Sequence, residues 1–369
     1  MCSLALGPLR NGCGRLPEPL LPKLVQLASD TYDAEVARRA GGRARFDYLA
    51  CRLSGLRTAP AGLANAAAAA FADLDDIHWP SVTHPGAIIW AAIDAVGATG
   101  DGLWRAAHMG YEVSTRLGEA LGPDHRRYWH ATATAGTVGA AVAAAVASGR
   151  DPVGPAAHAV SVAGGSSVCI FEYTATRVVH RDHAAAAGVR CARLGQLSAA
   201  LNCLEHPRGM FAAMGGTADA LLTVRTQTAL EEVSFRRHPT SGFNQAAVDV
   251  ARDLGPVSEP TVIELVVPGA TAALAAFPDP QDSEHAWWSC QHAVAVTLLG
   301  RDLATCPVDD PDVTRVRERI RVSVGQQTEL TVDGRTATRS QAVALTDEDL
   351  LAKWSRLNPE AAPPSELLT

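Results

Sequence analysis

The sequence predicts a mainly α protein: a large all-helical domain and a smaller α+β domain inserted near the C-terminus. Two observations support this prediction. Over the first two thirds of the 369 residues, apolar side chains recur at three- and four-residue intervals, which is the spacing of amphipathic helices. After about residue 230, short segments rich in β-branched residues alternate with helical segments, which indicates strands and helices in one unit.

The N-terminal part is expected to be a bundle of helices. A helical spacing over 22–39 is followed by Ala40-Gly41-Gly42, which is expected to end that helix. Asp101 is the expected N-cap of a later helix, and runs of Ala and Gly allow helices to approach closely. Further helices are predicted over 45–56, 63–73, 85–96, 100–121, 131–148, 152–164 and 182–204.

The C-terminal third is expected to contain the strands. Residues 261–267 (TVIELVV) are β-branched, and Asp333-Gly334 is a turn signal that leads into a short polar strand. Two further strands are predicted over 319–324 and 329–332, and helices over 244–254 and 285–299. We therefore assign residues 1–228, joined by 341–369, to the helical domain and residues 229–340 to the α+β domain.

Charge and composition exclude several classes of protein. The formal net charge of −7 argues against a nucleic-acid binder that relies on a general basic surface. The chain has only two lysines, Lys23 and Lys353, near its two ends. A central lysine that could form a Schiff base is therefore absent, and arginine cannot replace it as a general base near pH 7.

The cysteines and the hydropathy indicate a cytoplasmic protein. The eight cysteines form no CxxC pair, so neither a zinc ribbon nor a thioredoxin-like motif is expected, and most should be buried free thiols. Residues 1–19 lack the pattern of a signal peptide. The longest small-apolar run, 131–148, consists mainly of Ala, Gly and Thr, and a buried helix is favoured over a membrane span.

The segment 73–85 (DLDDIHWPSVTHP) is the richest in groups that can transfer protons. Its three aspartates and two histidines lie in a loop between two predicted helices, where catalytic groups are often placed. The alternative is that Asp73, Asp75 and Asp76 end one helix or cap the next. The same residue types can bind a metal ion, but their spacing is a weak zinc or iron pattern.

Two further segments carry histidines and arginines. His130 directly precedes the Ala-rich helix, where the helix dipole favours a neutral imidazole, although a hydrogen-bonded core histidine is the alternative. In 174–184 (TATRVVHRDHA), Arg177 could hold a substrate carboxylate. His180 and His183 would share a helix face, as a metal pair or as part of a solvated basic face.

Seven segments match, in order, the motifs of a known family. They are the loop 64–86 ending in His84-Pro85-Gly86, Gly110-Tyr111-Glu112-Val113, His130-Ala131-Thr132, Arg177-Val178-Val179-His180, and the segments 204–210, 238–243 and 283–295. As a set, they resemble the MmgE/PrpD family, which includes 2-methylcitrate dehydratase, cis-aconitate decarboxylase and iminodisuccinate epimerase. The resemblance runs from about Phe46 to Leu357.

The resemblance implies a fold and a chemistry. It implies a large helical domain with a smaller α+β lid, a homodimer, and an active site between the domains that uses neither metal nor cofactor. The implied substrates are small molecules with a carboxylate or carbonyl group, and the chemistry moves a proton next to that group. Neither nucleic acid nor a membrane is an expected partner.

The resemblance also assigns site residues one by one. Asp73, His84 and His130 match functional positions of the family directly, and His180 keeps the second histidine of its motif. Four positions depart: Ile77 replaces a threonine, Arg177 a lysine, Gln245 a lid histidine and His292 a tyrosine. We expect Asp73, His84, His130 and His292 to be catalytic, and Arg177, His180, Ile77, Trp79 and Gln245 to contact the substrate.

These assignments lead to an expected function. We expect a cofactor-independent lyase, in the first place a dehydratase that acts on a biosynthetic intermediate. His84 or His130 would remove the proton, the other histidine or His292 would protonate the leaving hydroxyl, Arg177 would bind the carboxylate, and Asp73 would orient a histidine. The alternatives are an isomerase, epimerase, cyclase or decarboxylase with the same site, and a catalytically degenerate binding subunit. The Ile77–Trp79 pair suggests a larger or less charged substrate than the family's usual acids.

Overall fold

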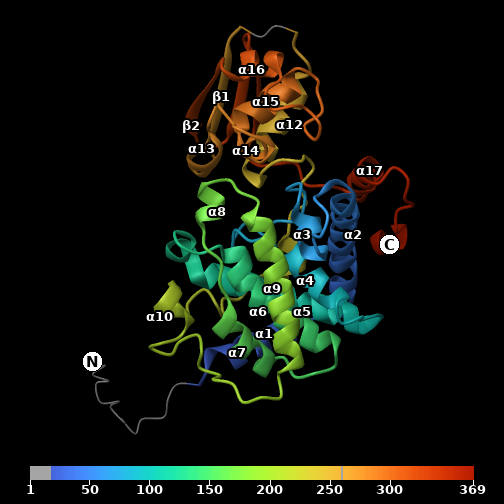
Figure 1. Ribbon diagram of the computed structural model, residues 1–369, viewed down its shortest axis with the longest axis vertical. Coiled ribbons are helices and arrows are strands. Elements are labelled where there is room, and N and C mark those ends of the chain that lie inside the picture. The colour runs from blue at the N-terminus through green and yellow to red at the C-terminus, as the bar shows by residue number, and fades with distance from the viewer. Residues whose placement is uncertain (1–17, 259–260) are drawn as a thin grey trace.

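The computed structural model describes residues 18–258 and 261–369 and shows a mainly helical protein with one small four-stranded sheet (Figure 1). Cys2 and Cys13, and the start of the predicted helical domain, lie outside the described residues. The helices of the first two thirds are α1 Leu20–Asp30, α2 Ala34–Thr58, α3 Asn65–Ala70, α4 Pro85–Asp94, α5 Asp101–Arg126, α6 Ala131–Ala147, α7 Val153–Val162, α8 Val168–Phe171, α9 Thr176–Arg193, α10 Met210–Met214 and α11 Ala229–Glu232.

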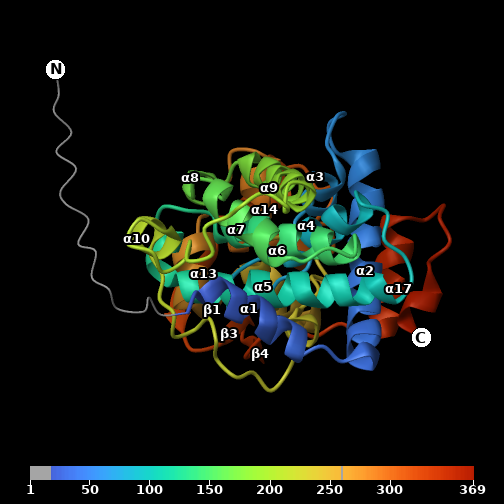
Figure 2. The same cartoon turned by 90° about the horizontal axis from the view of Figure 1, so that it is seen from below.

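The Ala-rich helix α6 lies at the centre of the bundle, between α5 and α9 (Figure 2). These helices approach closely because glycines lie at the contacts. A Cβ atom built on Gly139 would lie 2.7 Å from the carbonyl oxygen of Gly110, and one built on Gly188 would lie 2.4 Å from the Cβ of Ala140. The helix 131–148 is therefore a buried core element, as its composition predicts. Among residues 18–258 and 261–369, no helix combines the length and apolar character needed to cross a membrane.

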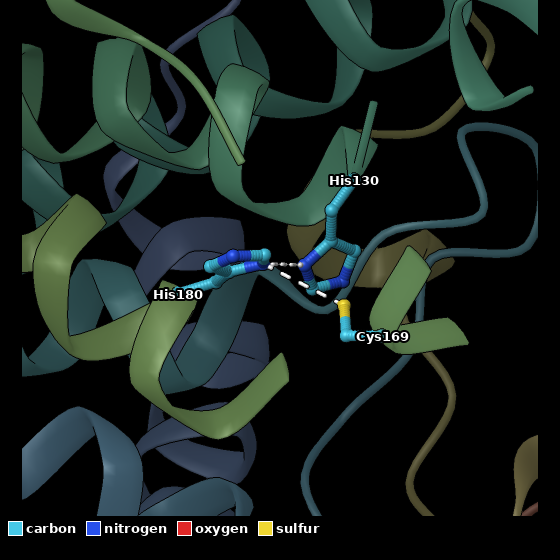
Figure 3. A group of neighbouring side chains, drawn as sticks. All are labelled: His130, Cys169 and His180. Carbon is cyan, nitrogen blue, oxygen red and sulfur yellow. Dashed lines mark hydrogen bonds between the residues drawn. The ribbon is translucent and has the colours of Figure 1, made fainter. Parts of the chain in front are cut away.

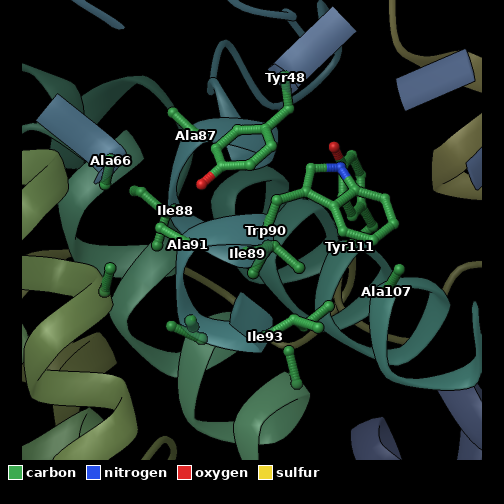
Figure 4. Packing of buried hydrophobic residues seen from close by; sticks show 14 of the residues in the cluster. Tyr48, Ala66, Ala87, Ile88, Ile89, Trp90, Ala91, Ile93, Ala107 and Tyr111 are labelled. Carbon is green, nitrogen blue, oxygen red and sulfur yellow. The ribbon is translucent and has the colours of Figure 1, made fainter. Parts of the chain in front are cut away.

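The core beside α6 is built on α4, whose large side chains are fully buried (Figure 4). Ile88, Ile89, Trp90 and Ile93 pack with Tyr111 of α5 and with small alanines of α3 and α5. Because α4 is apolar on every face, it forms only when neighbouring helices cover it. The loop that precedes it is thereby anchored at its C-terminal end.

The predicted helix boundaries are wrong in four places. Gly41 and Gly42 lie inside α2. The helical conformation is interrupted earlier, at residues 31–33, where the Asp33 carboxylate caps α2. Asp101 lies in the first turn of α5, and Gly100 with a φ of 63° is the N-cap. The helix predicted over 182–204 is α9, which runs from Thr176 to Arg193, and the helix predicted over 285–299 is broken at Ser289.

The strands agree with the sequence prediction. The order in the sheet is β2-β1-β3-β4, with β1 Ile263–Pro268 parallel to β2 Ile320–Gly325 and antiparallel to β3 Thr328–Val332, which pairs with β4 Arg335–Arg339. Asp333 and Gly334 both have positive φ, as a two-residue hairpin turn requires. The sheet shares one hydrophobic core with α12 Gln245–Leu254, α15 Cys290–Leu298 and α16 Pro311–Arg317.

Short helices and the C-terminal segment complete the fold. α13 Gly269–Ala275 lies beside the sheet, α14 Ser283–Trp288 packs against α15, and a 3₁₀ turn, η1 Gly242–Asn244, precedes α12. After β4 the chain returns to the helical bundle, where α17 Asp347–Leu357 packs on α2 through Trp354 and Phe46 (Figures 1 and 2). A final turn, η2 Ser365–Leu368, lies against Gly42.

Candidate active site

A cavity of about 690 Å³ contains most of the residues that the sequence singles out. Its walls come from the loop before α4, the start of α6, helix α9, the segment 241–246 and helix α13. Residues from the helical bundle and from the part that carries the sheet therefore share one site. Asp73, Ile77, Trp79, His84, His130 and Arg177 line it.

The loop 73–84 is held in place by backbone hydrogen bonds and unusual torsion angles. Ile77 exchanges two backbone hydrogen bonds of 2.8 Å with Ser234, which ties the loop to the segment after α11. Asp73 and Val82 have φ values of 51° and 53°, a region that aspartate tolerates and that is strained for valine. The surrounding fold thus holds the backbone of the loop in a conformation that its own residues do not favour.

Three buried arginines surround the two aspartates at the base of the cavity. Arg177 donates from Nη2 to Asp73 Oδ2 at 2.8 Å, and Arg236 pairs with both Asp73 (3.3 Å) and Asp75. Arg181 places Nε 3.4 Å from Asp75 Oδ2, without the geometry of a hydrogen bond. Three positive charges against two negative ones leave a surplus positive charge, which suits an incoming anion.

The arginines keep both aspartates ionised. Burial by itself would raise the pKa of Asp73, but the charges of Arg177, Arg236 and Arg181 outweigh burial and hold that pKa below its usual range. The pKa of Asp75 is lowered by Arg181 and Arg236 in the same way, against the effect of burial. Asp73 therefore orients arginines, whereas the sequence interpretation expected it to orient a histidine.

Some polar atoms of this cluster have no hydrogen-bond partner. Among the described residues, the buried Nε groups of Arg177 and Arg181 and the Oδ2 atom of Asp75 are unpartnered. An unpaired buried donor costs roughly 1–3 kcal/mol. Both arginines line the cavity, but their Nε atoms expose almost no surface, so these donors lie among packed side chains and do not face the cavity.

His84 presents one ring nitrogen to the cavity. Its Nδ1 lies 2.7 Å from the backbone carbonyl oxygen of Asp76, which can only accept, so Nδ1 carries the proton. Nε2 then holds a lone pair. Burial, followed by the charge of Arg236, lowers the pKa of His84 to about 3, so the imidazole is neutral near pH 7. A neutral imidazole with a free Nε2 can act as a general base.

Asp76 lies behind His84 and stabilises the start of α4. Its carboxyl group receives hydrogen bonds from the Gly86 amide (2.9 Å) and the Tyr111 hydroxyl (2.8 Å). Burial, and then the negative charge of Asp75, raises the pKa of Asp76 to about 7. Since Asp76 does not line the cavity, its carboxyl group supports the backbone that holds His84.

His130, at the N-terminus of α6, contacts His180 of α9 and lies near Cys169 of α8 (Figure 3). The Nδ1 atoms of the two histidines are 3.1 Å apart, and the Cys169 Sγ lies 3.7 Å from His180 Nδ1. Burial, followed by the charge of Arg181, keeps the pKa of His130 well below its usual value. His180 does not line the cavity, so it reaches the site only through His130.

The three side chains could in principle hold a metal ion, because their ligand atoms lie within 4.8 Å of one another. Two observations speak against this. The arginines next to His130 repel a cation, and burial raises the pKa of the Cys169 thiol, which favours its protonated form. We interpret the group as a hydrogen-bonded support for His130. Cys169 is one of five buried free cysteines in the described residues, as predicted for most of them.

Ile77 and Trp79 contribute an apolar wall to the cavity. The Trp79 ring meets Phe243 edge-on, with ring centroids 5.7 Å apart, and both residues line the cavity. A Cβ atom on Gly242 would lie 3.2 Å from Ile77 and 3.3 Å from Trp79. The two residues singled out as markers of an unusual substrate thus face one cavity.

Gln245 and His292 do not line the cavity. The Gln245 amide accepts from the backbone N–H groups of Arg237 and His238 and donates to the carbonyls of His238 and Thr240, so it holds the turn before α12. His292 is buried in α15 with Nδ1 3.4 Å from Arg317 Nη1. Burial and then the charge of Arg317 lower its pKa to about 4. The side chains of Gln245 and His292 therefore hold other parts of the protein in place, outside the cavity in which they were expected.

Three charged residues that line the cavity were not among the predicted site residues. Arg181 lies four residues after Arg177 on α9, so helical spacing could have indicated that the two share a face. Arg236 carries no such signal, because its partners Asp73 and Asp75 lie more than 160 residues earlier. Arg126 also lines the cavity, from the end of α5.

Comparison with known proteins gives one family match. The family model described as the MmgE/PrpD N-terminal domain matches residues 34–222, just over half of the chain, and includes the loop 73–84, His130 and Arg177. No curated protein matches the chain.

Proposed function

This chain belongs to the MmgE/PrpD family, whose members are generally dehydratase-like lyases, and on that premise we propose that it dehydrates a hydroxy acid without a metal or cofactor. The observation that carries the proposal is the juxtaposition, in one cavity, of a surplus positive charge on buried arginines and two neutral histidines. The family match supports the class of reaction, and the site supports the assignment of roles.

The substrate carboxylate binds at the arginine cluster. Arg177, Arg181 and Arg236 line the cavity, and the cluster carries one more positive charge than Asp73 and Asp75 neutralise. Charge-assisted hydrogen bonds from guanidinium groups to a carboxylate are short and directional. They also stabilise the additional negative charge that appears on the carboxylate when the neighbouring C–H bond breaks.

His84 is the general base and His130 the general acid. His84 Nε2 takes the proton from the carbon next to the carboxylate, and the C–H electron pair forms the new C=C bond. The C–O bond at the next carbon breaks, and the hydroxyl group leaves as water with the Nε2 proton of His130. The proton on the His84 imidazolium then passes to His130 through the released water, so that both imidazoles are neutral after the step. In this scheme, His180 Nδ1–H donates to His130 Nδ1, which leaves the proton of His130 on Nε2.

The arrangement of the chain fits the same proposal. We propose residues 229–340 as a lid over a helical domain of 1–228 and the returning segment 341–369, except that α11 Ala229–Glu232 packs in the core of the helical bundle and belongs with that domain. The sheet region supports this division, because its core cluster contains residues from 247 to 332. We include a homodimer and a cytoplasmic location as part of the proposal, on the family resemblance.

The test measures proton transfer and elimination directly. The enzyme is incubated in D₂O with citrate, 2-methylcitrate, 3-hydroxybutanoate or 3-hydroxy-3-phenylpropanoate, and NMR follows deuterium at C2 and the appearance of an alkene. We expect elimination of at least one probe. His84→Gln and His130→Gln should each lower the rate roughly 10²–10⁴-fold, the usual contribution of a general acid or base.

Three results separate this proposal from its alternatives. Deuterium at C2 without an alkene indicates an isomerase or epimerase with the same base. Release of CO₂ indicates a decarboxylase. Binding without exchange or turnover of any probe, or full activity in both histidine variants, contradicts the proposal and favours a binding subunit. His183→Gln, an exposed histidine on α9, is the matched control and should leave the rate unchanged.

A further inference from the structure

The lining of the cavity combines buried arginines with a group of large apolar side chains, and we infer that its ligand is an amphipathic acid: one carboxylate joined to an apolar body about the size of an aromatic ring. This inference rests on the proposed function, because it places the reacting carbon beside the arginine-bound carboxylate. It goes beyond that function by naming the class of substrate.

The charge at the base of the cavity fits one carboxylate. Arg177, Arg181 and Arg236 face Asp73 and Asp75, which leaves a single uncompensated positive charge. A tricarboxylate would bring two further negative charges. An unpaired charge that is buried against apolar side chains is costly, so these additional carboxylates would need cations of their own.

Arg126 is the other positively charged residue of the lining. It comes from the end of α5, is half-buried, and has no ion pair among the described residues. One more cation could serve a second polar group, but it could not balance both extra charges of a tricarboxylate. The charges of the lining are thus matched to an acid with one carboxylate and, at most, one further anionic group.

The apolar wall is continuous and suited to a ring. Trp79 and Phe243 make an edge-on pair, and Gly242 lies between Trp79 and Ile77, where even a methyl group would be in contact with both. Trp79 is 39% exposed, so part of this large aromatic side chain remains uncovered. A ligand that covers it gains hydrophobic and stacking energy that a fully polar acid does not.

Further apolar side chains extend the wall. Phe171 and Ile170 of α8 and Leu274 of α13 line the same cavity, and Phe171 is 53% exposed. A volume of about 690 Å³ lies within the roughly 300–1,000 Å³ typical of sites for drug-sized ligands. The cavity therefore has both the room and the lining for a hydrophobic body next to the carboxylate.

Binding of simple probes tests the class of ligand without turnover. Trp79, Trp129 and Trp288 line the cavity, so their fluorescence should report binding, and calorimetry gives the affinity. The probes are 3-phenylpropanoate, its alcohol 3-phenylpropanol, and citrate. We expect 3-phenylpropanoate to bind at least ten-fold more tightly than either of the others, because only it satisfies both the arginines and the wall.

Single substitutions test which lining residues bind the carboxylate of the probe and which bind its ring. Trp79→Ala should weaken 3-phenylpropanoate about ten-fold and leave citrate unchanged, whereas Arg177→Met should weaken both acids. Arg126→Ala should leave 3-phenylpropanoate unchanged. Tyr128→Ala, an exposed aromatic residue that does not line the cavity, is the control. Circular dichroism of each variant verifies its fold.

The outcomes distinguish this inference from the proposed function. Citrate binding more tightly than 3-phenylpropanoate, or a Trp79→Ala variant with unchanged affinity, overturns the amphipathic substrate. Failure of 3-phenylpropanoate to bind overturns it as well. His84→Gln should retain 3-phenylpropanoate binding while it loses proton exchange. If the probe binds as expected but no hydroxy acid exchanges its proton, the result supports the inferred class of ligand and contradicts the proposed reaction.

Discussion

At the scale of single residues, Arg177 makes contacts that a lysine could not reproduce. Its guanidinium donates to Asp73 and to the Thr174 carbonyl, keeps Nε free, and lies over the Trp288 ring with 5.8 Å to the ring centroid. A lysine ammonium has three donors on one atom and no planar face. The arginine at a position where the resemblance implies a lysine therefore makes protein contacts that depend on the guanidinium group.

Arg177→Lys should weaken binding of a carboxylate probe about 10–100-fold, because the hydrogen bonds to Asp73 and Thr174 that position the cation, and the contact with Trp288, are lost. Calorimetric titration with 3-phenylpropanoate measures this change. Arg190→Lys, an exposed position on the same helix, is the control and should have no effect. Unchanged affinity in Arg177→Lys would show that the site needs only a positive charge there.

The raised pKa of Asp76 predicts that the stability of the protein depends on pH. Its pKa is raised from the ordinary aspartate value of 3.8 to about 7 in the folded protein, because the carboxyl group is buried beside the Asp75 charge. A raised folded pKa means that this contribution to stability is full below about pH 4 and is lost as the pH rises through 7. Asp76→Asn, which stays neutral and can still accept from Gly86, removes this dependence.

Between pH 4 and pH 8, the unfolding free energy of Asp76→Asn should rise relative to wild type by on the order of 4 kcal/mol, because each unit of difference between the folded and unfolded pKa corresponds to about 1.4 kcal/mol. Urea denaturation at each pH measures it. The exposed Asp219→Asn serves as the control. A constant difference between Asp76→Asn and wild type over this range would show that Asp76 is ionised throughout.

At the scale of elements, glycines in helices have roles that local preferences do not reveal. Gly41 and Gly42 look like a helix end, yet α2 continues through them. A Cβ atom on Gly42 would lie 2.1 Å from the Leu367 carbonyl oxygen, so the C-terminal turn η2 can lie there only against a glycine. Packing between distant segments thus outweighs the low helix propensity of glycine.

Gly42→Ala should lower the free energy of unfolding by about 1–3 kcal/mol, because the new methyl group displaces the backbone of η2. Gly102→Ala is the matched control in helix α5, where nothing lies within 4 Å of the added Cβ atom. That substitution should be neutral or stabilise by up to about 1 kcal/mol. Thermal unfolding of both variants measures the contrast, and equal effects would refute a packing role for Gly42.

At the scale of the whole molecule, the C-terminal helix supports the active-site loop. Lys353 of α17 is buried and donates to Asp47 of α2 at 2.5 Å and to the Leu74 carbonyl at 2.7 Å. Leu74 lies between Asp73 and Asp75, so one ammonium group connects the end of the chain, helix α2 and the base of the cavity. Burial raises the pKa of Asp47, which the Lys353 charge opposes.

Lys353→Met should destabilise the protein by about 3–5 kcal/mol, since it leaves the Asp47 carboxylate buried without its cation. The double variant Asp47→Asn/Lys353→Met removes both charges and should recover part of this loss. Urea denaturation of the two variants and of wild type gives both values. Equal stabilities of the single and double variants would show that the buried charge is not the cause.

Much of this protein could be predicted from its sequence because the features concerned are local. Helical spacing and β-branched runs indicated α6, the strands and the hairpin at Asp333-Gly334, and motif order indicated the family. The loop 73–84 and His130 were identified as site candidates because unusual groups of ionisable residues are visible in sequence. The helix end at Gly41 was misplaced because glycines there serve packing, and the N-cap at Asp101 was misplaced because Gly100 with positive φ occupies that position.

The pairing of the charges, by contrast, depends on the folded structure. Asp73 binds Arg236, and Lys353 supports Leu74, across separations of 163 and 279 residues. Spacing along the chain does not encode such pairs. Alignment to a family also placed Gln245 and His292 at functional positions, but their side chains bond to a turn and to Arg317. A buried polar group takes whichever partner the packing brings within reach, and that is a property of the folded chain.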